Sequence, residues 1–351
     1  MQEKTVLVTG GAGYIGSHVV KQLGEAGYQV VVYDNCSTGS ADAVLYGELI
    51  RGDLADQDRL YQLFAQYQFS AVLHFAASLV VPESVIRPLD YYTNNTRNTL
   101  NLLRCCAVAK IQHFIFSSTA AVYGEPEIVP VTEQATTLPI NPYGRSKLMS
   151  EWLIRDAGSV SSMRSVILRY FNVAGADSSG QLGQNAERAE HLIRAACDTA
   201  LKRKPCLKIF GTDFDTPDGT AIRDYIHVED LASAHLAALR YLEQGGESQT
   251  LNCGYGRGYS VRQVVERVKA ISGVDFPVVE TDRRIGDPAC VTACVDRIRA
   301  TLDWTPQYDD LDTIVKSTLD WEKRRPSQPD YKYLASDLAV NAVKANGATV
   351  H

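Results

Sequence analysis

Short apolar runs alternate with amphipathic stretches through the first half of the chain. The runs are TVLVTG, YQVVVYD, SAVLHFAA, HFIFSST and RSVILRYFNVAG, and their length and β-branched content are typical of buried strands. Stretches between them, such as residues 56–68 and 89–110, carry apolar residues at helical spacing. This alternation predicts an α/β fold in which helices cover both faces of a parallel sheet.

The pattern changes from about residue 175. Gly, Ser, Asp and Pro interrupt shorter elements in AGADSSGQLGQN, FGTDFDTPDGT and RRIGDPA. We therefore expect a main domain in residues 1–175 and a smaller, mixed α/β domain on the substrate side in residues 176–325. The segments RDYIHVEDLASAHLAALRYL and QTLNCGYG, near residues 222–256, are expected to return to the main sheet as a helix and a strand. Residues 326–351 form a C-terminal tail with only weak pattern.

Composition and charge narrow the class of protein. The chain has 351 residues, of which 45% are hydrophobic and 22% charged, so it can bury a large core. No segment approaches the roughly 18 apolar residues that a membrane span requires, and MQEKTVLVTG enters a strand without a leader, so we expect a cytoplasmic protein. A net charge of −6 without a basic block argues against a nucleic-acid partner. The eight cysteines form no CxxC motif and do not pair with nearby histidines, which indicates neither a metal site nor a disulfide framework.

Three glycines follow the first predicted strand directly. VLVTGGAGYIGSH places Gly10, Gly13 and Gly16 at the mouth of a helix, where glycine permits a tight turn and lets a pyrophosphate approach the backbone and the helix N-terminus. The spacing GxxGxxG alone also fits a plain turn with packing glycines, but the strand before and the helix after favour a dinucleotide loop. These features predict a Rossmann-type doubly wound sheet.

Two aspartates refine the cofactor prediction. Asp34 ends the second predicted strand about 20 residues after the glycines, where a carboxylate accepts from a ribose 2′-hydroxyl and repels a 2′-phosphate. NAD is therefore favoured over NADP. Asp53 in RGDL is a candidate on the adenine side, although it could instead cap a helix that begins near residue 56.

NPYGRSK carries a tyrosine and a lysine four residues apart, which places Tyr143 and Lys147 on one face of a helix. A tyrosine with a pKa near 10 acts as a base near neutrality only if its pKa falls by about three units, or roughly 4 kcal/mol. One cation about 4 Å away contributes about that much at an effective dielectric constant near 20, and an oxidised nicotinamide ring would add to it. The pair also fits an ordinary exposed helix face. The hydroxyl-rich strand end FSSTAAVYG favours the catalytic interpretation, because Thr119 can hydrogen-bond the same reacting hydroxyl.

Several motifs together resemble one family. TGGAGYIGSH, VYDN, HFAA, SSTAAVYG, NPYGRSK, RYFNVAGA, GTAIRDYIHVEDLA and RRIGDPA occur in order, between about residue 4 and about residue 325. This set is similar to the extended short-chain dehydrogenase/reductase superfamily and, closely, to its UDP-glucose 4-epimerase family. The resemblance implies that UDP-sugars are epimerised at carbon 4 with no net redox change, through a 4-keto sugar and a hydride held by NAD. It also suggests a homodimer formed through helices near residues 89–110 and 142–157.

The resemblance implies roles for particular residues. Tyr143 takes the proton of the sugar 4-hydroxyl, Lys147 tunes the tyrosine and holds the nicotinamide ribose, and Thr119 supports the proton. The implied cofactor contacts are Gly10, Gly13, Tyr14, Ile15, Gly16, Asp34, Asn35, Asp53, Leu54, Phe75, Ala76, Ala77, Tyr143, Lys147 and Tyr170. The implied substrate contacts are Thr119, Tyr143, Asn172, His191, Leu192, Arg223, Arg284, Asp287 and Val291.

Some of these assignments have alternatives. Arg223 and Arg284 stand where the family grips the diphosphate, as guanidinium groups are suited to do, but each also fits a surface salt bridge. His191 stands where asparagine is common, and a capping or packing histidine fits equally well. Leu79 replaces a lysine that many members carry near the cofactor, so one cofactor contact is in doubt.

Rival activities leave different signatures. Sugar 4,6-dehydratases and uronate decarboxylases need an acid or base just after the threonine, whereas Ala120 and Ala121 follow Thr119 here and cannot move protons. A UDP-uronate 4-epimerase would use the same catalytic residues. A non-catalytic NAD-sensing regulator could use the same fold, but it would not need Tyr143 and Lys147.

In the resembling family, substrate breadth is associated with the size of one side chain, seven positions after the second arginine of the RRxGD loop. A tyrosine there closes the sugar pocket to a 2-acetamido group, and a small residue leaves it open. Val291 occupies this position, or Cys290 if the loop is one residue shorter. Both are small, which predicts activity on UDP-N-acetylglucosamine and UDP-N-acetylgalactosamine as well. Alternatively, Val291 begins the strand VTACV and packs inward.

Overall fold

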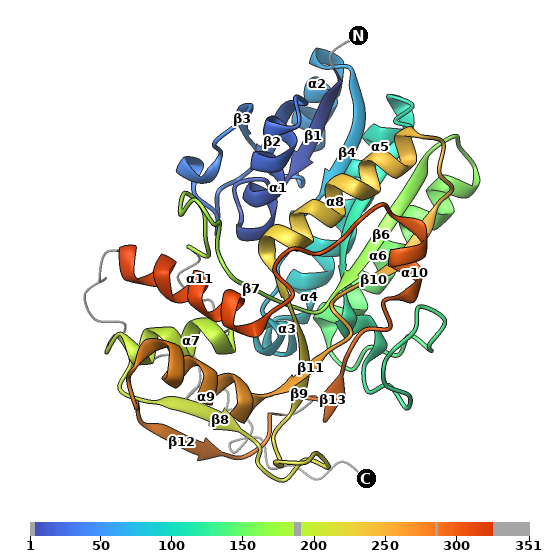
Figure 1. The fold of residues 1–351 in the computed structure, drawn as a ribbon. Helices are drawn as coiled ribbons and strands as arrows, with labels where there is room; N and C mark the ends of the chain where they lie inside the picture. Colours follow the sequence, from blue (N-terminus) through green and yellow to red (C-terminus); the bar gives the residue numbers. More distant parts are fainter. Residues whose placement is uncertain (1–3, 186–190, 285–286, 326–351) are drawn as a thin grey trace.

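The computed structural model describes residues 4–185, 191–284 and 287–325, and its main layer is a seven-stranded parallel sheet (Figure 1). The strands run in the order β10–β6–β5–β4–β1–β2–β3. Their bounds are β1 (Thr5–Thr9), β2 (Gln29–Asp34), β3 (Glu48–Arg51), β4 (Phe69–His74), β5 (His113–Thr119), β6 (Arg164–Tyr170) and β10 (Gln249–Cys253). All six pairings between them are parallel, which confirms the predicted sheet.

Helices cover both faces of this sheet. One face packs against α1 (Tyr14–Glu25) and α8 (Val228–Glu243), and the other against α2 (Gln57–Gln66), α5 (Asn98–Val108) and α6 (Pro142–Ser159). Side chains of a strand point alternately to the two faces, so Val6 and Val8 of β1 enter one core while Leu7 enters the other. The apolar runs read from the sequence are continuous because both faces are buried. The Rossmann-type doubly wound fold is therefore confirmed.

The connection between β4 and β5 is more broken than the predicted helix at 89–110. It contains α3 (Val81–Ile86), α4 (Pro88–Tyr91) and a π-helical turn, η2 (Tyr92–Arg97), which runs directly into α5. Short 3₁₀ turns also occur at η1 (Ala41–Ala43) and η3 (Ala120–Tyr123).

The second half of the chain adds smaller sheets below the main one (Figure 1). Strand β9 (Ile222–His227) pairs in parallel with β7 (Asn172–Ala174) and β13 (Cys290–Val291), and antiparallel with β11 (Gly258–Ser260). Strand β8 (Leu207–Phe210) pairs with β12 (Val278–Thr281). A separate core is shared by α7 (Leu192–Ala200), α9 (Val261–Ser272) and α11 (Leu311–Arg324). The short helix α10 (Asp296–Thr301) packs instead against the main core.

From β9 the chain passes through α8 into β10, at the edge of the main sheet. The part of the chain that holds the smaller sheets mixes helices with parallel and antiparallel strands, as the sequence indicated. The division between residues 175 and 176 stays a prediction. The tail at 326–351 lies outside the described residues.

The two central strands position the candidate site. β1 and β4 are neighbours, and the strand order runs outward from them in both directions, so their carboxyl ends open a crevice of the kind that binds ligands in such sheets. The amides of Phe75 and Ala76 both donate to the carbonyl of Thr9, at 2.9 and 3.1 Å. Among the helices that the structure describes, none combines the length and apolar character needed to cross a membrane.

Candidate active site

The glycine loop is closed tightly around the start of α1. Gly10 has φ +75°, and a Cβ there would lie 2.4 Å from the Ala76 amide nitrogen. A Cβ on Gly16 would lie 2.2 Å from the Gly10 carbonyl oxygen, whereas the nearest atom to a Cβ on Gly13 is 3.3 Å away. Gly13 is the N-cap of α1 and makes no side-chain cap bond, so the helix begins with backbone N–H groups available to an anion. These features fit a dinucleotide pyrophosphate.

Asp34 lies beside this loop at the end of β2. Its Oδ2 accepts from the Ala12 amide at 2.9 Å and its Oδ1 from the Cys36 amide at 2.7 Å. Each carboxylate oxygen has a further lone pair, so the group is fixed and can still accept from a ribose hydroxyl.

Asp53 lies in the loop after β3 and organises it. Its carboxylate accepts from the Asn35 side-chain amide and from the Ala55 backbone amide, both at 2.8 Å. The alternative that Asp53 caps the next helix is wrong, because Asp56 is the N-cap of α2 and accepts from the Arg59 amide at 3.0 Å. The cause is local geometry, since the turn between the two aspartates leaves Asp56 next to the free amides.

The remaining implied cofactor residues fall along the same edge of the sheet. Tyr14 and Ile15 begin α1, and the Tyr14 hydroxyl donates to the Gly175 carbonyl at 2.6 Å. The Leu54 carbonyl accepts from Asn101 at 3.1 Å. Phe75, Ala76 and Ala77 form the turn after β4, and Tyr170 ends β6. Leu79 is 55% exposed, as a side chain without a core role would be.

Tyr143, Lys147 and Thr119 come together at the carboxyl end of β5. α6 begins at Pro142 with Asn141 as its N-cap, and the Asn141 side chain accepts from the Gly144 amide at 2.9 Å. Tyr143 and Lys147 lie one turn apart on this helix. The Tyr143 residue is 7% exposed and Lys147 is 3% exposed. The Thr119 hydroxyl lies close enough to Tyr143 to influence the pKa of its phenol.

The electrostatics differ from the expectation drawn from the spacing. Burial raises the pKa of Tyr143 well above its usual value, Tyr170 and Tyr91 raise it further, and the neighbouring Thr119 side chain opposes this rise. The Lys147 ammonium donates to the Ser117 carbonyl at 2.7 Å and lies 4.6 Å from the centre of the Phe116 ring. Burial also lowers the pKa of Lys147 to about 7. The pKa of Tyr143 is therefore raised overall in this structure, with Thr119 as the group that opposes the rise. The lowering effect expected from Lys147 stays a prediction for the complex with cofactor.

Of the implied nucleotide-binding residues, Asn172, Arg223 and Asp287 lie on or beside β9, whereas Arg284 lies against β8. Asn172 of β7 lies beside Tyr225 of β9, and burial raises the pKa of Tyr225 to about 12. Arg223 donates to Asp287 at 3.1 Å and to the Ile222 carbonyl at 2.8 Å. The Arg284 guanidinium lies 3.7 Å from the centre of the Phe210 ring. Phe210 was not predicted, although an aromatic residue ending a short strand before a glycine could have indicated it.

His191 and Leu192 lie at the start of α7. His191 is the N-cap of the helix but makes no side-chain cap bond, so the capping alternative is wrong. Burial and the neighbouring Arg194 lower its pKa to about 4, and a neutral imidazole can donate one hydrogen bond. The side chain lines a small cavity together with Tyr14 and Gly175, which places it between the substrate residues and the start of α1.

Val291 lies in β13 directly beside Arg223 of β9. It is 7% exposed and packs into the main core, as the alternative interpretation required. Its contact with the strand that carries Arg223 also puts it next to the candidate substrate residues. Cys290 pairs with Ile222 in the same ladder and is partly exposed.

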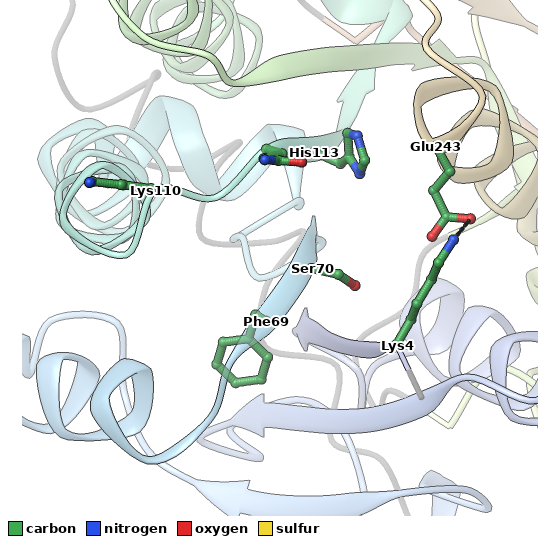
Figure 2. A pocket seen from close by; sticks show the side chains of 7 residues that line it. Lys4, Phe69, Ser70, Lys110, His113 and Glu243 are labelled. Atoms are coloured by element: carbon green, nitrogen blue, oxygen red, sulfur yellow. Dashed lines mark ion pairs between the residues drawn. The ribbon is translucent and has the colours of Figure 1, made fainter. Parts of the chain in front are cut away.

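A separate hollow lies at the opposite, amino end of the strands (Figure 2). Lys4, Ser70, His113 and Glu243 line it, and the Lys4 ammonium lies 3.0 Å from the Glu243 carboxylate. Ligands of open parallel sheets bind at the carboxyl ends, so this hollow does not compete with the crevice above β1 and β4.

The sheet order and the arrangement at its carboxyl edge are those of a dinucleotide-binding Rossmann-type enzyme. Residues 6–254 match the model of the NAD dependent epimerase/dehydratase family. The UDP-glucose 4-epimerase of Azospirillum brasilense is 56% identical over 319 residues, which cover 91% of this chain and 92% of that protein. The chain belongs to the NAD dependent epimerase/dehydratase family.

Solved structures agree with this placement. The UDP-glucose 4-epimerase from Brucella ovis, in complex with NAD, has a TM-score of 0.88 and 44% identity and covers 90% of this chain and 98% of its own. The UDP-Glc/GlcNAc 4-epimerase from Campylobacter jejuni has a TM-score of 0.81 and 48% identity and covers 92% of this chain and 100% of its own.

Proposed function

We propose that the chain is an NAD-dependent 4-epimerase of UDP-sugars that interconverts UDP-glucose and UDP-galactose through a transient 4-keto sugar. The observation that carries this proposal is the buried set of Tyr143, Lys147 and Thr119 at the carboxyl end of β5, in the sheet whose β1 leads into the glycine loop. The similarity to UDP-glucose 4-epimerases over most of the chain supports it.

The proposed catalytic residues divide the proton chemistry between them. Tyr143 takes the proton of the sugar 4-hydroxyl and returns it when the opposite face has reacted. Thr119 holds the reacting hydroxyl in line with the phenol, and Lys147 supplies positive charge that favours the phenolate. When bound, NAD would supply the hydride acceptor for carbon 4 and, once reduced, the hydride donor, so no outside oxidant would be needed.

The proposed binding residues surround this centre. The free N–H groups at the start of α1 hold the pyrophosphate, Asp34 accepts from the adenosine ribose, and Asn35 and Asp53 shape the adenine side. On the substrate side, Arg223 and Arg284 neutralise the diphosphate. The other proposed contacts on that side are Asn172, His191, Leu192, Phe210 and Asp287.

Incubation of the purified protein with UDP-glucose, UDP-galactose and their N-acetylamino forms, followed by chromatography, tests the proposal. We expect each sugar to be converted to its 4-epimer, and UDP-glucuronate to remain unchanged. Bound NAD should also show a reduced-nicotinamide absorption when a UDP-sugar is added. A protein that binds NAD but converts none of the sugars would be a regulator, and conversion of UDP-glucuronate alone would assign a uronate epimerase.

Asp34→Ala is expected to admit NADP, because the carboxylate that repels a 2′-phosphate is gone. Asp34 also accepts from two backbone amides, so the alanine variant loses part of the loop structure as well. Asp34→Asn is the matched control, since it removes the charge and keeps a carbonyl acceptor. Calorimetric titration of the parent and both variants with NAD and NADP should show NADP binding in both variants. Equal binding of the two cofactors by the parent would refute the role of Asp34.

Val291→Tyr is expected to abolish conversion of the acetylated sugars while conversion of UDP-galactose persists. Overfilling a packed site costs about 1–3 kcal/mol, enough to prevent a 2-acetamido sugar from turning in the pocket. Because Val291 also packs into the core, thermal unfolding must be measured alongside the assay. Val291→Ile, which enlarges the side chain only slightly, is the control. A parent that converts UDP-galactose but neither acetylated sugar would contradict the prediction.

We also propose a homodimer formed through α5 and α6. These helices pack on each other and expose the apolar side chains of Val108, Met149 and Trp152, with Leu89 of α4 nearby. Sedimentation equilibrium distinguishes a dimer from a monomer of 38.6 kDa. The eight free thiols further support a cytoplasmic location, because the cytosol keeps thiols reduced.

A further inference from the structure

Three consecutive residues at the end of β5 hold three side chains that lie one turn apart on α6. The pairs are the Ser117 carbonyl with the Lys147 ammonium at 2.7 Å, the Ser118 hydroxyl with the Glu151 carboxylate at 2.6 Å, and Thr119 with Tyr143. The proposed function uses the first and third pairs and leaves the second without a role.

Glu151 is fully buried at the centre of a network of charged groups. Arg169 of β6 binds its two oxygens with Nε at 2.9 Å and Nη2 at 2.6 Å, a bidentate geometry. Arg155 adds a bond at 2.8 Å from the exposed side of α6. From Arg169 the network continues to the Tyr123 hydroxyl at 3.0 Å and from there to Asn252 at 2.6 Å. Glu151 therefore ties α6 to β5 and β6.

We propose that Glu151 is a positioning residue of the active site, whose buried carboxylate keeps the neighbouring Lys147 ammonium charged and holds α6 against the end of β5. This inference rests on the proposed function, because it assigns to Glu151 the support of the Tyr143 and Lys147 pair.

The charges around Lys147 show why one carboxylate matters. The groups that contact Lys147 or interact with its charge are the Phe116 ring and the Ser117 carbonyl of β5, His74 of β4 and Glu151 of α6. Tyr143 lies one turn away on α6, Tyr170 of β6 lies near Tyr143, and Arg169 of β6 is bound to Glu151. His74 is neutral, since burial lowers its pKa to about 3. Of these groups Glu151 alone is a carboxylate. It raises the pKa of Lys147 against the larger opposing effect of burial.

A purely structural role would not require charge at this place. A buried ion pair is often no more stabilising than well-packed apolar residues of similar volume. Here the carboxylate lies one helical turn from the lysine, which places it within reach of the ammonium field. Arg169 is the main counter-charge of Glu151, and its two hydrogen bonds fix the orientation of the carboxylate.

A set of charge variants tests the sign of this effect. In the holoenzyme with UDP-galactose, Glu151→Gln should move the alkaline limb of the pH profile of kcat to lower pH by at least about one unit, because Lys147 loses its proton more easily. Arg169→Gln should move the limb upward, since Glu151 then acts on Lys147 without its main counter-charge. The double variant should return toward the parent. Arg155→Gln, which removes the exposed partner of the same carboxylate, is the control and should leave the limb within a few tenths of a pH unit.

A second measurement follows Lys147 directly. NMR titration of ε-¹³C-lysine in the same proteins should show one resonance, missing from Lys147→Met, whose midpoint moves in the same directions. If Glu151→Gln does not fold, as thermal unfolding will show, Arg169→Gln and the double variant still decide the sign.

Unchanged limbs and midpoints in the folded variants, with only stability reduced, would overturn the proposal and leave Glu151 as a packing residue. Full activity of Lys147→Met would instead refute the proposed role of the lysine. In that case the NMR midpoints still decide whether Glu151 controls its charge.

Discussion

Tyr143→Phe is expected to reduce epimerisation by at least about a hundredfold, the usual scale for loss of a general base. The substitution removes one buried hydroxyl and keeps the ring, which packs edge-on against Tyr91 with 6.5 Å between ring centres. The fold and NAD binding should therefore stay close to those of the parent. The loss should appear in kcat rather than in KM, because the phenol acts in the reaction step.

Tyr28→Phe is the matched control for this prediction. Its hydroxyl donates to Glu243 at 2.9 Å, at the amino end of the sheet and away from the crevice. Both variants lose one phenolic hydroxyl and keep the ring. Turnover should fall only in the Tyr143 variant. Near-normal turnover there would remove Tyr143 from the proposed chemistry and leave the site without a base at this position.

The parts of the molecule that the sequence predicts well depend on local spacing. The strands of the main sheet appear as unbroken apolar runs because helices bury both of their faces, as Val6 and Leu7 illustrate. The glycine loop and the pair Tyr143 and Lys147 each lie within a few residues of one another. Their relative placement is therefore fixed once the local element forms, whatever the rest of the chain does.

The contacts that the sequence does not reveal join elements far apart in the chain. Arg223 and Asp287 are separated by 64 residues and meet only because β9 and β13 are neighbours. Glu151 lies four residues after Lys147, a spacing visible in the sequence, but its partner Arg169 belongs to another element. Asp53 and Asp56 are both residue types that cap helices well, so the sequence does not distinguish them. The backbone geometry of the turn decides that Asp56 is the cap of α2.

Burial accounts for the largest difference between expectation and structure. The spacing of Tyr143 and Lys147 predicted a cation that lowers the pKa of the phenol, and it said nothing of the environment. Both side chains are almost completely buried, and burial disfavours the charged form of each. The site therefore holds groups whose useful ionisation opposes folding, a common property of functional sites.

Lys147→Met is accordingly expected to lower activity at least about a hundredfold and yet to stabilise the protein without added ligand at neutral pH. In the parent, burial lowers the folded-state pKa of Lys147 to about 7, against about 10.4 in the unfolded chain. The difference corresponds to roughly 4 kcal/mol of destabilisation at neutral pH. Loss of the bond to the Ser117 carbonyl offsets about 1 kcal/mol of the gain. The remaining pH optimum should also move upward, since the phenol loses its nearest cation.

The pH dependence of stability separates this explanation from improved packing. Between about pH 7 and about pH 10 the unfolded parent binds a proton at Lys147 that the folded parent does not, so parental stability should rise with pH, by at most about 1.4 kcal/mol per unit. The methionine variant lacks this contribution, whereas all other titrating groups are common to both proteins. Urea unfolding at several pH values should therefore show the variant's advantage greatest at and below pH 7 and vanishing toward pH 10. A constant advantage would mean that better packing of methionine is the cause, and parallel curves without any advantage would mean that Lys147 keeps an ordinary pKa in the folded chain.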